Sequence, residues 1–157
     1  MNKLVEQIIR DPEFAEGEAW RRRVFSPGDV VIREGDDARH MYLVESGSLR
    51  VSGRVELEDS RAIQPGLADL GPGDLFGELA LFESRPRTAS VVALEQGVLV
   101  EIDCERLSAY LDARPEVGYA LLKAMYRILI DRLAKANQRL EHLFAWGLKV
   151  HGIDKHL

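Results

Sequence analysis

The sequence predicts an α+β fold, an antiparallel β-roll (jelly-roll-like) flanked by short N-terminal helices and a long C-terminal helix. Two observations lead to this fold class. Between residues 24 and 102, short β-rich runs are punctuated by glycine and aspartate, as in strands joined by tight turns. After residue 115, apolar residues recur at a helical spacing that is kept for three heptads.

The composition sets the class of protein. The 157 residues are 46% hydrophobic and 30% charged, which predicts a soluble globular domain that can bury a core without disulfides. A net charge of −5 argues against general nucleic-acid binding, which needs a clustered basic face. The only compact basic run, residues 21–23, is expected to be a solvated helix end. One cysteine, Cys104, excludes an intrachain disulfide, is expected to be a buried structural thiol, and favours the reducing cytoplasm.

No targeting or membrane segment is expected. The N-terminus lacks the apolar stretch of a signal peptide, and no charge-free apolar run approaches the ~20 residues of a membrane helix. Residues 3–10 instead predict a short amphipathic helix with Leu4, Val5, Ile8 and Ile9 on one side, ended near Asp11-Pro12.

The strand region has internal landmarks. Its β-rich runs are SPGDVVIREGDD, HMYLVESGSLRVSG and TASVVALEQGVLVEI. Residues 56–69 are expected to be a variable loop or a hairpin tip. Gly71 and Gly73 around Pro72 predict a turn ahead of a strand. The same glycines do not complete a dinucleotide fingerprint with Gly77, which comes one place late, and the sequence contains no P-loop.

Two helices are predicted after the strands. Residues 105–111 predict one or two helical turns, and a long helix covers 115–146, ended by Gly147. The seam of this long helix alternates spacings of four and three residues, through Leu122, Tyr126, Leu129, Leu133, Ala136, Leu140 and Leu143. Such a seam favours a helical partner, and therefore a homodimer, over packing on its own domain.

The segment FGELALFESRPRTASV, residues 76–91, has the features of an anion site. Gly77 lets the backbone approach a ligand closely, and residues 78–82 can form a helical turn with free N–H groups. The guanidinium of Arg87 can hold two phosphate oxygens, and Ala89 is small enough for its N–H to approach. Glu78 cannot serve the same anion, because like charges repel, so it must face a hydroxyl group. The pattern predicts a ribose phosphate.

This segment resembles the phosphate-binding cassette of the cyclic nucleotide-binding domain family, found in catabolite-activator-type regulators, cyclic-nucleotide-dependent kinases and cyclic-nucleotide-gated channels. The resemblance extends upstream to Gly28-Asp29, Glu34-Gly35-Asp36, Tyr42 and Gly47, and downstream to helices similar to the family's B and C helices. It covers residues 14–144. Its implied ligand is cyclic AMP or cyclic GMP, with no metal and no other cofactor.

The resemblance also implies roles for individual residues. Glu78 accepts a hydrogen bond from the ribose 2′-OH and Arg87 pairs with the cyclic phosphate. Backbone N–H groups complete the cradle near Gly77, Leu79, Ala80 and Ala89. The Thr88 hydroxyl can touch the phosphate or the amino group of a guanine, which leaves the choice of base open. Asn137 of the long helix is a candidate contact for the base, or an exposed helix asparagine.

The resulting interpretation is a single domain over 1–157. It has a β-roll at 14–103 with the cassette at 76–91, and a lid or dimerisation helix at 115–146. The expected protein is a non-catalytic cyclic-nucleotide sensor that moves its C-terminal helix and acts on an unknown protein partner, without nucleic acid or membrane. The alternatives are the sensor part of a catabolite-activator-type transcription regulator without its DNA-binding domain, and a ligand-free interaction module of the same fold. About a dozen residues after Phe144 are too few to read DNA. An enzyme acting on the nucleotide ranks last, because no His/Asp cluster is present for a metal-dependent phosphodiesterase.

Overall fold

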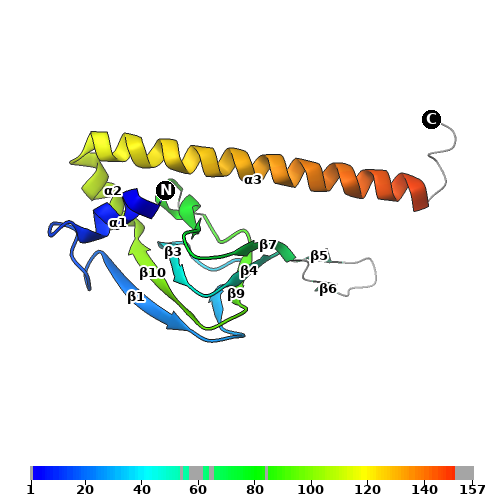
Figure 1. Ribbon diagram of the computed structural model, residues 1–157, viewed down its shortest axis with the longest axis horizontal. Helices are drawn as coiled ribbons and strands as arrows, with labels where there is room; N and C mark the ends of the chain where they lie inside the picture. Colours follow the sequence, from blue (N-terminus) through cyan, green and yellow to red (C-terminus); the bar gives the residue numbers. More distant parts are fainter. Residues whose placement is uncertain (1, 54, 57–61, 64–65, 84, 151–157) are drawn as a thin grey trace. The chain divides into compact units, whose positions relative to one another are not determined.

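The computed structural model of the protein describes residues 2–53, 55–56, 62–63, 66–83 and 85–150, and divides into two compact units, Met1–Pro115 and Glu116–Leu157 (Figure 1). Its elements in chain order are α1 (Asn2–Arg10), β1 (Trp20–Phe25), β2 (Val30–Ile32), β3 (His40–Ser46), β4 (Leu49–Ser52), β5 (Val55–Glu56), β6 (Ala62–Ile63), β7 (Gly66–Leu70), β8 (Leu75–Phe76), the 3₁₀ helix η1 (Glu78–Leu81), β9 (Ser90–Ala93), β10 (Gly97–Asp103), α2 (Cys104–Asp112) and α3 (Pro115–Val150).

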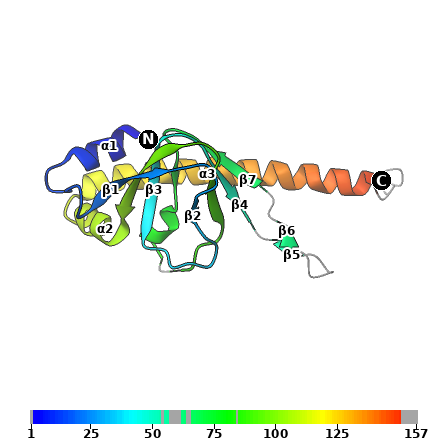
Figure 2. The same cartoon turned by 90° about the horizontal axis from the view of Figure 1, so that it is seen from below.

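The strands of the first unit form a β-roll of two four-stranded sheets, in the orders β1-β10-β3-β8 and β2-β9-β4-β7 (Figures 1 and 2). Every pairing within them is antiparallel, and the first sheet joins the beginning of the roll to its end, with Trp20 opposite Ile102. Short β5 and β6 pair only with each other. The predicted fold class, an antiparallel roll with a short N-terminal and a long C-terminal helix, is therefore confirmed.

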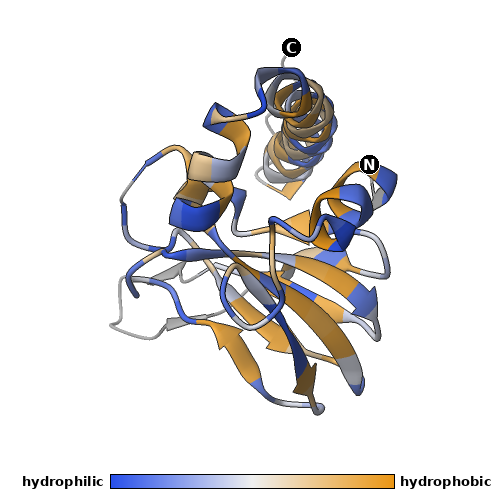
Figure 3. Ribbon diagram, turned by 90° about the vertical axis from the view of Figure 1, so that its left-hand side faces the viewer, coloured by the Kyte–Doolittle hydropathy of each residue, from blue (hydrophilic) through white to orange (hydrophobic). Residues whose placement is uncertain are grey.

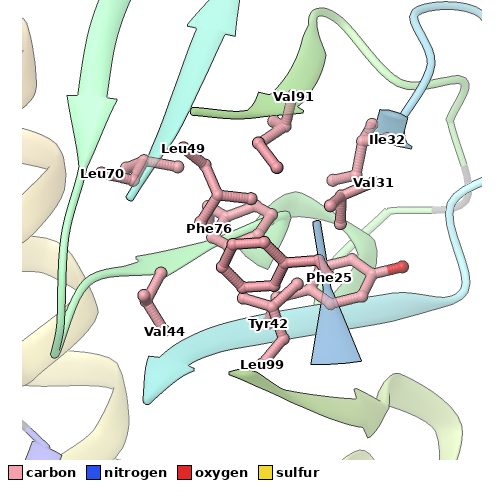
Figure 4. Close-up of a cluster of buried hydrophobic side chains, with 11 residues drawn as sticks. Phe25, Val31, Ile32, Tyr42, Val44, Leu49, Leu70, Phe76, Val91 and Leu99 are labelled. Carbon is pink, nitrogen blue, oxygen red and sulfur yellow. The ribbon is translucent and has the colours of Figure 1, made fainter. Parts of the chain in front are cut away.

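The core of the roll lies between the two sheets (Figure 4). The first sheet contributes Phe25, Tyr42, Val44, Phe76 and Leu99, and the second Val31, Ile32, Leu49, Leu70, Val91 and Ala93. The core residues of β3 and β9 alternate along the strand, as Tyr42 with Val44 and Val91 with Ala93, whereas Val31 and Ile32 of β2 are consecutive. Figure 3 shows apolar strands joined by more polar loops. Burying each large aliphatic or aromatic side chain here contributes about 1.5–3 kcal/mol to folding.

The N-terminal helix α1 has the predicted amphipathic character, since Val5 and Ile8 are buried. The segment after it is tied to the rest of the unit by polar contacts. The Tyr110 hydroxyl of α2 donates to Asp11 Oδ2 at 2.6 Å, and the indole Nε1 of Trp20 donates to the Phe14 carbonyl at 2.9 Å. Burial and the neighbouring Asp11 carboxylate raise the pKa of Tyr110 to about 12, so its hydroxyl stays a donor at neutral pH.

Helix α2 begins directly after β10 and covers the predicted residues 105–111. Asp103 is its N-cap, because the carboxylate accepts from the Arg106 N–H at 2.9 Å. The thiol of Cys104 in the first turn is buried, as predicted, and burial raises its pKa to about 11. It therefore remains a neutral thiol and is a poor nucleophile.

Two predicted boundaries are wrong. Gly147 does not end the long helix, because α3 continues to Val150. A glycine inside a helix costs roughly 0.5–1 kcal/mol relative to alanine, too little to end it. Of the residues 56–69 that were expected to be a variable loop or a hairpin tip, 66–69 belong to β7, whose Leu70 is buried and whose strand pairs with β4, while 57–61 and 64–65 lie outside the described residues. The helix-end expectation for residues 21–23 is also wrong, because they lie in β1.

Helix α3 forms the second unit. It begins at Pro115 and runs for 36 residues. Proline lacks a backbone N–H, and it is tolerated at the first position of a helix because an N–H there would have no acceptor within the helix. In the described part of the chain, no helix combines the length and apolar composition needed to cross a lipid bilayer.

Candidate ligand-binding site

The cassette starts where β8 ends, at a backbone bend that requires glycine. Gly77 has φ +71° and is the N-cap of η1. A Cβ added at this position would lie 2.8 Å from Nη1 of Arg87 and 3.3 Å from the His40 carbonyl oxygen. Any larger residue would therefore strain the turn and push Arg87 out of its place.

The predicted helical turn is η1, a single 3₁₀ turn. The first N–H groups of such a turn have no acceptor within it and can face an anion. The N–H of Ala80 donates to the Gly77 carbonyl at 3.2 Å, so this one predicted donor is already engaged within the turn. Glu78, at the start of η1, is 9% exposed. A carboxylate is rarely buried to this degree unless it has polar partners.

Arg87 folds back onto the start of the cassette. Its Nη1 donates to the Gly77 carbonyl at 3.2 Å and its Nη2 donates to the His40 carbonyl at 2.6 Å. A guanidinium has five N–H donors. Among the residues that the structure describes, two are used on these carbonyls, which leaves three, and a bidentate contact with a phosphate needs two. The half-buried side chain is thus fixed on one edge and still able to hold an oxyanion.

The backbone of Arg87 is fixed as well. Its N–H donates to the Asp36 carbonyl at 2.9 Å and its carbonyl accepts from the Gly35 N–H at 2.9 Å. Nearby, the Ser90 hydroxyl accepts from the Glu34 N–H at 3.0 Å. The turn at residues 34–36, which the resemblance included without a role, therefore anchors the end of the cassette.

The structure brings most of the predicted residues into one segment. Gly77, Glu78, Leu79 and Ala80 form its first turn, and Arg87 returns to that turn. Exposed Thr88 and half-buried Ala89 follow immediately and lead into β9. Asn137 is exposed on α3, in the other unit, so its contact with a base stays a prediction.

Two residues that contact Arg87 were not predicted as part of the site. His40 supplies a carbonyl, and the ring of Tyr42 lies under the guanidinium, 5.8 Å from Cζ to the ring centroid. No local sequence pattern connects β3 with the cassette, because the contact depends on the pairing of β3 with β8. Only the strand alternation, which turns Tyr42 into the roll, could have pointed to it.

The run of residues 21–23 is ion-paired, and its side chains stay largely exposed to solvent, as predicted, at 67%, 48% and 39%. Arg22 holds Glu45 through two nitrogens, with Nη2 2.9 Å from Oε1. Arg21 and Arg23 both approach Glu101, at 2.6 and 3.7 Å. Glu101 is only 4% exposed, and its burial is possible because cations surround it. Three arginines paired with acids do not form a basic face.

A separate cavity of about 590 Å³ lies in the first unit, away from the cassette. Trp20, Leu43 and Val44 line it together with Arg22 and Glu45. Glu6 and Arg10 also line it, so four charged side chains face the cavity, and they pair as Arg22 with Glu45 at 2.9 Å and Arg10 with Glu6 at 4.0 Å. Within the described residues, no three His, Cys, Asp or Glu side chains come together as metal ligands.

Comparison with known proteins agrees with this geometry. The family model described as "Cyclic nucleotide-binding domain" matches residues 22–114. The CRP-like cAMP-activated global transcriptional regulator of Mycobacterium tuberculosis is 33% identical over 119 residues, covering 76% of this chain and 50% of that protein.

Solved structures show the same fold. The c-di-GMP responsive global regulator CLP of Xanthomonas campestris has a TM-score of 0.63 and 32% identity, covering 73% of this chain and 55% of that one. A cyclic nucleotide-binding domain from Methylobacillus flagellatus has a TM-score of 0.70 at 20% identity, covering 88% and 79%, and supports the fold alone. The chain spans about half the length of the two regulators. Because the family model matches more than half of the residues, this chain belongs to the cyclic nucleotide-binding domain family.

Proposed function

We propose that the chain is a non-catalytic sensor that binds a cyclic purine mononucleotide, cyclic AMP or cyclic GMP, in the cassette. The observation that carries this proposal is the position of Arg87, whose guanidinium is hydrogen-bonded to the Gly77 carbonyl, one residue before the buried side chain of Glu78. A cation with unused donors beside an acid suits a ligand whose phosphate and hydroxyl lie close together. A 3′,5′-cyclic ribose phosphate has this arrangement.

Each residue has a stated role in this proposal. Arg87 pairs with the cyclic phosphate, and Glu78 accepts from the ribose 2′-OH. The N–H groups of Gly77, Leu79 and Ala89 approach the phosphate oxygens. The N–H of Ala80 joins them if ligand draws it away from the Gly77 carbonyl. Thr88 contributes a hydroxyl at the exposed side of the cassette, and Asn137 reaches the base when α3 closes as a lid.

The proposed response is a shift between two states of the chain. Ligand can move such an equilibrium only by binding one state more tightly than the other. The cassette is joined to α3 through β9, β10 and α2, and α2 is the proposed hinge. The proposed output is an effect of α3 on an unknown downstream protein. The buried single thiol Cys104 fits a reducing compartment, so the proposed location is the cytoplasm.

A second candidate is the sensor part of a longer transcription regulator. The observation that favours it is the length of the matched regulators, of which this chain spans 50% and 55%. The same ligand site serves both candidates. Sequencing the natural reading frame beyond residue 157 distinguishes them, because a regulator would continue into a DNA-binding module.

Thermal unfolding with ligand tests the proposed function. At about a hundred times the dissociation constant, a cyclic mononucleotide should stabilise the chain by ~2.7 kcal/mol and raise the unfolding midpoint by roughly 5–10 °C. The compounds are cyclic AMP, cyclic GMP, cyclic di-GMP and, as a control with an open phosphate, 5′-AMP. A shift with cyclic di-GMP alone would replace the proposed ligand, and no shift with any compound up to millimolar concentration would refute the site.

We also propose that the chain forms a homodimer through α3. Six of the seven seam residues are large and at least 38% exposed, namely Leu122, Tyr126, Leu129, Leu133, Leu140 and Leu143. A row of such residues at heptad spacing is stable in water when a second helix covers it.

Replacing one seam residue by lysine tests the homodimer. Leu133→Lys puts a charge into the seam and should convert the dimer to a monomer at micromolar concentration. Gln138→Lys is the matched control, because residue 138 lies on the opposite side of the helix from the seam, and it should leave the dimer intact. Mass in solution, by sedimentation or light scattering, measures both. A wild-type protein that stays monomeric at high micromolar concentration would exclude the dimer.

A further inference from the structure

The ring of Tyr42 is placed between the core and the cassette. Tyr42 is 5% exposed in the middle of β3, and its backbone pairs with Phe76 on one side and Glu101 on the other. Its ring stacks on Phe76, with centroids 5.0 Å apart and an interplanar angle of 17°. Figure 4 shows both rings within the core cluster, where their neighbours limit their movement.

A second partner of this ring is the guanidinium of Arg87, with Cζ 5.8 Å from the centroid. At this separation an aromatic face attracts a cation, and arginine adds the contact of a flat group with a flat ring. The ring also approaches Gly77, since a Cβ there would lie 3.3 Å from Cδ2 of Tyr42. Tyr42, Gly77 and Arg87 thus form one packed group.

Three partners therefore restrain the guanidinium without using all of its donors. The carbonyls of Gly77 and His40 accept two N–H groups, and the Tyr42 ring covers part of the guanidinium. An arginine side chain that moves freely in solution would lose rotamer freedom when a ligand fixed it. A side chain that is already fixed avoids much of that loss at the moment of binding.

We propose that Tyr42 is the positioning residue for Arg87, and that its aromatic ring holds the guanidinium at the cassette before ligand arrives. This inference rests on the proposed function for its effect on affinity, but the hold on Arg87 exists without ligand. The ring is the operative group. The hydroxyl is not, because in the described part of the chain no hydrogen bond joins the Tyr42 hydroxyl to Arg87.

The first measurement needs no ligand. The Nε–Hε signal of Arg87 is identified in ¹⁵N NMR spectra of the full chain by its loss in Arg87→Lys. In the wild type this signal should carry a ring-current shift and a high order parameter. Tyr42→Leu should remove the shift and lower the order parameter, whereas Tyr42→Phe should keep both. An Arg87 signal that is unchanged by Tyr42→Leu would overturn the proposal, whether or not the chain binds a nucleotide.

The second measurement is the affinity for cyclic AMP and cyclic GMP by titration calorimetry. Tyr42→Leu should weaken binding about 3- to 30-fold, the range of one partly buried cation–π contact. Tyr42→Phe should restore most of this affinity. Phe25→Leu is the matched control, because it also truncates an aromatic residue of the same core cluster. Phe25 lies on β1, which pairs with β10 and not with β8, the strand that leads into the cassette turn.

The outcomes separate the two hypotheses. Phe25→Leu should lower the unfolding temperature much as Tyr42→Leu does, while leaving affinity within about twofold of wild type. Equal losses of affinity in both variants would mean that Tyr42 acts through general core stability, and the positioning role would be wrong. A loss in Tyr42→Phe as large as in Tyr42→Leu would assign the effect to the hydroxyl and also overturn the proposal. If the wild-type protein binds neither nucleotide, the proposed function is refuted. The NMR measurement then tests by itself whether the Tyr42 ring restrains the Arg87 guanidinium.

Discussion

Arg87→Glu is expected to abolish binding of cyclic AMP and cyclic GMP and to leave a folded protein. The substitution replaces the cation that faces the phosphate by an acid, so attraction becomes repulsion in the same half-buried place. Arg87→Gln removes the charge without reversing it. Losing one partner of a desolvated, hydrogen-bonded charge pair costs about 2–5 kcal/mol, so affinity should fall roughly 30-fold to several thousand-fold.

The ligand-free protein should tolerate both substitutions. The guanidinium makes two charge-assisted hydrogen bonds to carbonyls, and each contributes about 1.5–3 kcal/mol net. Their loss should lower the unfolding midpoint but stay below the 5–15 kcal/mol that holds a typical domain folded. Circular dichroism and the unfolding midpoint without ligand verify the fold, and calorimetry measures the affinity.

Arg85 is the matched control for Arg87. It lies two residues earlier, is exposed, and its Nε is 2.5 Å from Glu83 Oε2. Arg85→Gln makes the same change of net charge and should alter affinity less than about twofold, because exposed ion pairs contribute little. If Arg85→Gln weakened binding as much as Arg87→Gln, the effect would be one of overall charge. If Arg87→Glu still gained stability from ligand, the phosphate would bind elsewhere.

Gly97→Ala is expected to destabilise the fold by about 3 kcal/mol, at the upper end of the usual cost of overpacking. Gly97 opens β10 and faces Phe25 of β1. A methyl group there would collide with the Ser46 carbonyl oxygen and the Phe25 ring, and would lie 2.7 Å from the Ser46 carbonyl carbon. Backbone and core ring would both have to shift, and a packed interior resists this.

Urea unfolding followed by circular dichroism measures this loss of stability. In a separate thermal scan, the midpoint temperature of unfolding should fall by roughly 6–12 °C. Gly71→Ala is the control, because a Cβ at residue 71 meets nothing within 4 Å and its backbone is not in the left-handed region. Its stability should stay within about 0.5 kcal/mol of wild type. A loss below 1 kcal/mol for Gly97→Ala would show that β1 and β3 can move apart at this end of the roll.

Arg87 and Gly97 differ in whether their importance could be predicted from the sequence. Arg87 was found from the sequence because glycine, acid and arginine stand within eleven residues of one another and their chemistry is local. Gly97 was not singled out, because its φ is not in the left-handed region and no turn motif marks it. Glycine is required at residue 97 because Ser46 and Phe25 lie against it, and both come close through the pairing of β10 with β3 and β1.

Four features could be predicted from the order of the amino acids: the class of fold, the amphipathic α1, the helical seam of α3 and the cassette with its candidate ligand residues. These features depend on the period of apolar residues and on short-range spacing, which the chain carries along its length. Three others became visible in the folded chain: residues 21–23 are ion-paired on a strand, residues 66–70 pair with β4, and Tyr42 and the His40 carbonyl contact Arg87. They could not be predicted because antiparallel pairing joins residues tens of positions apart, and no local pattern records which strands become neighbours.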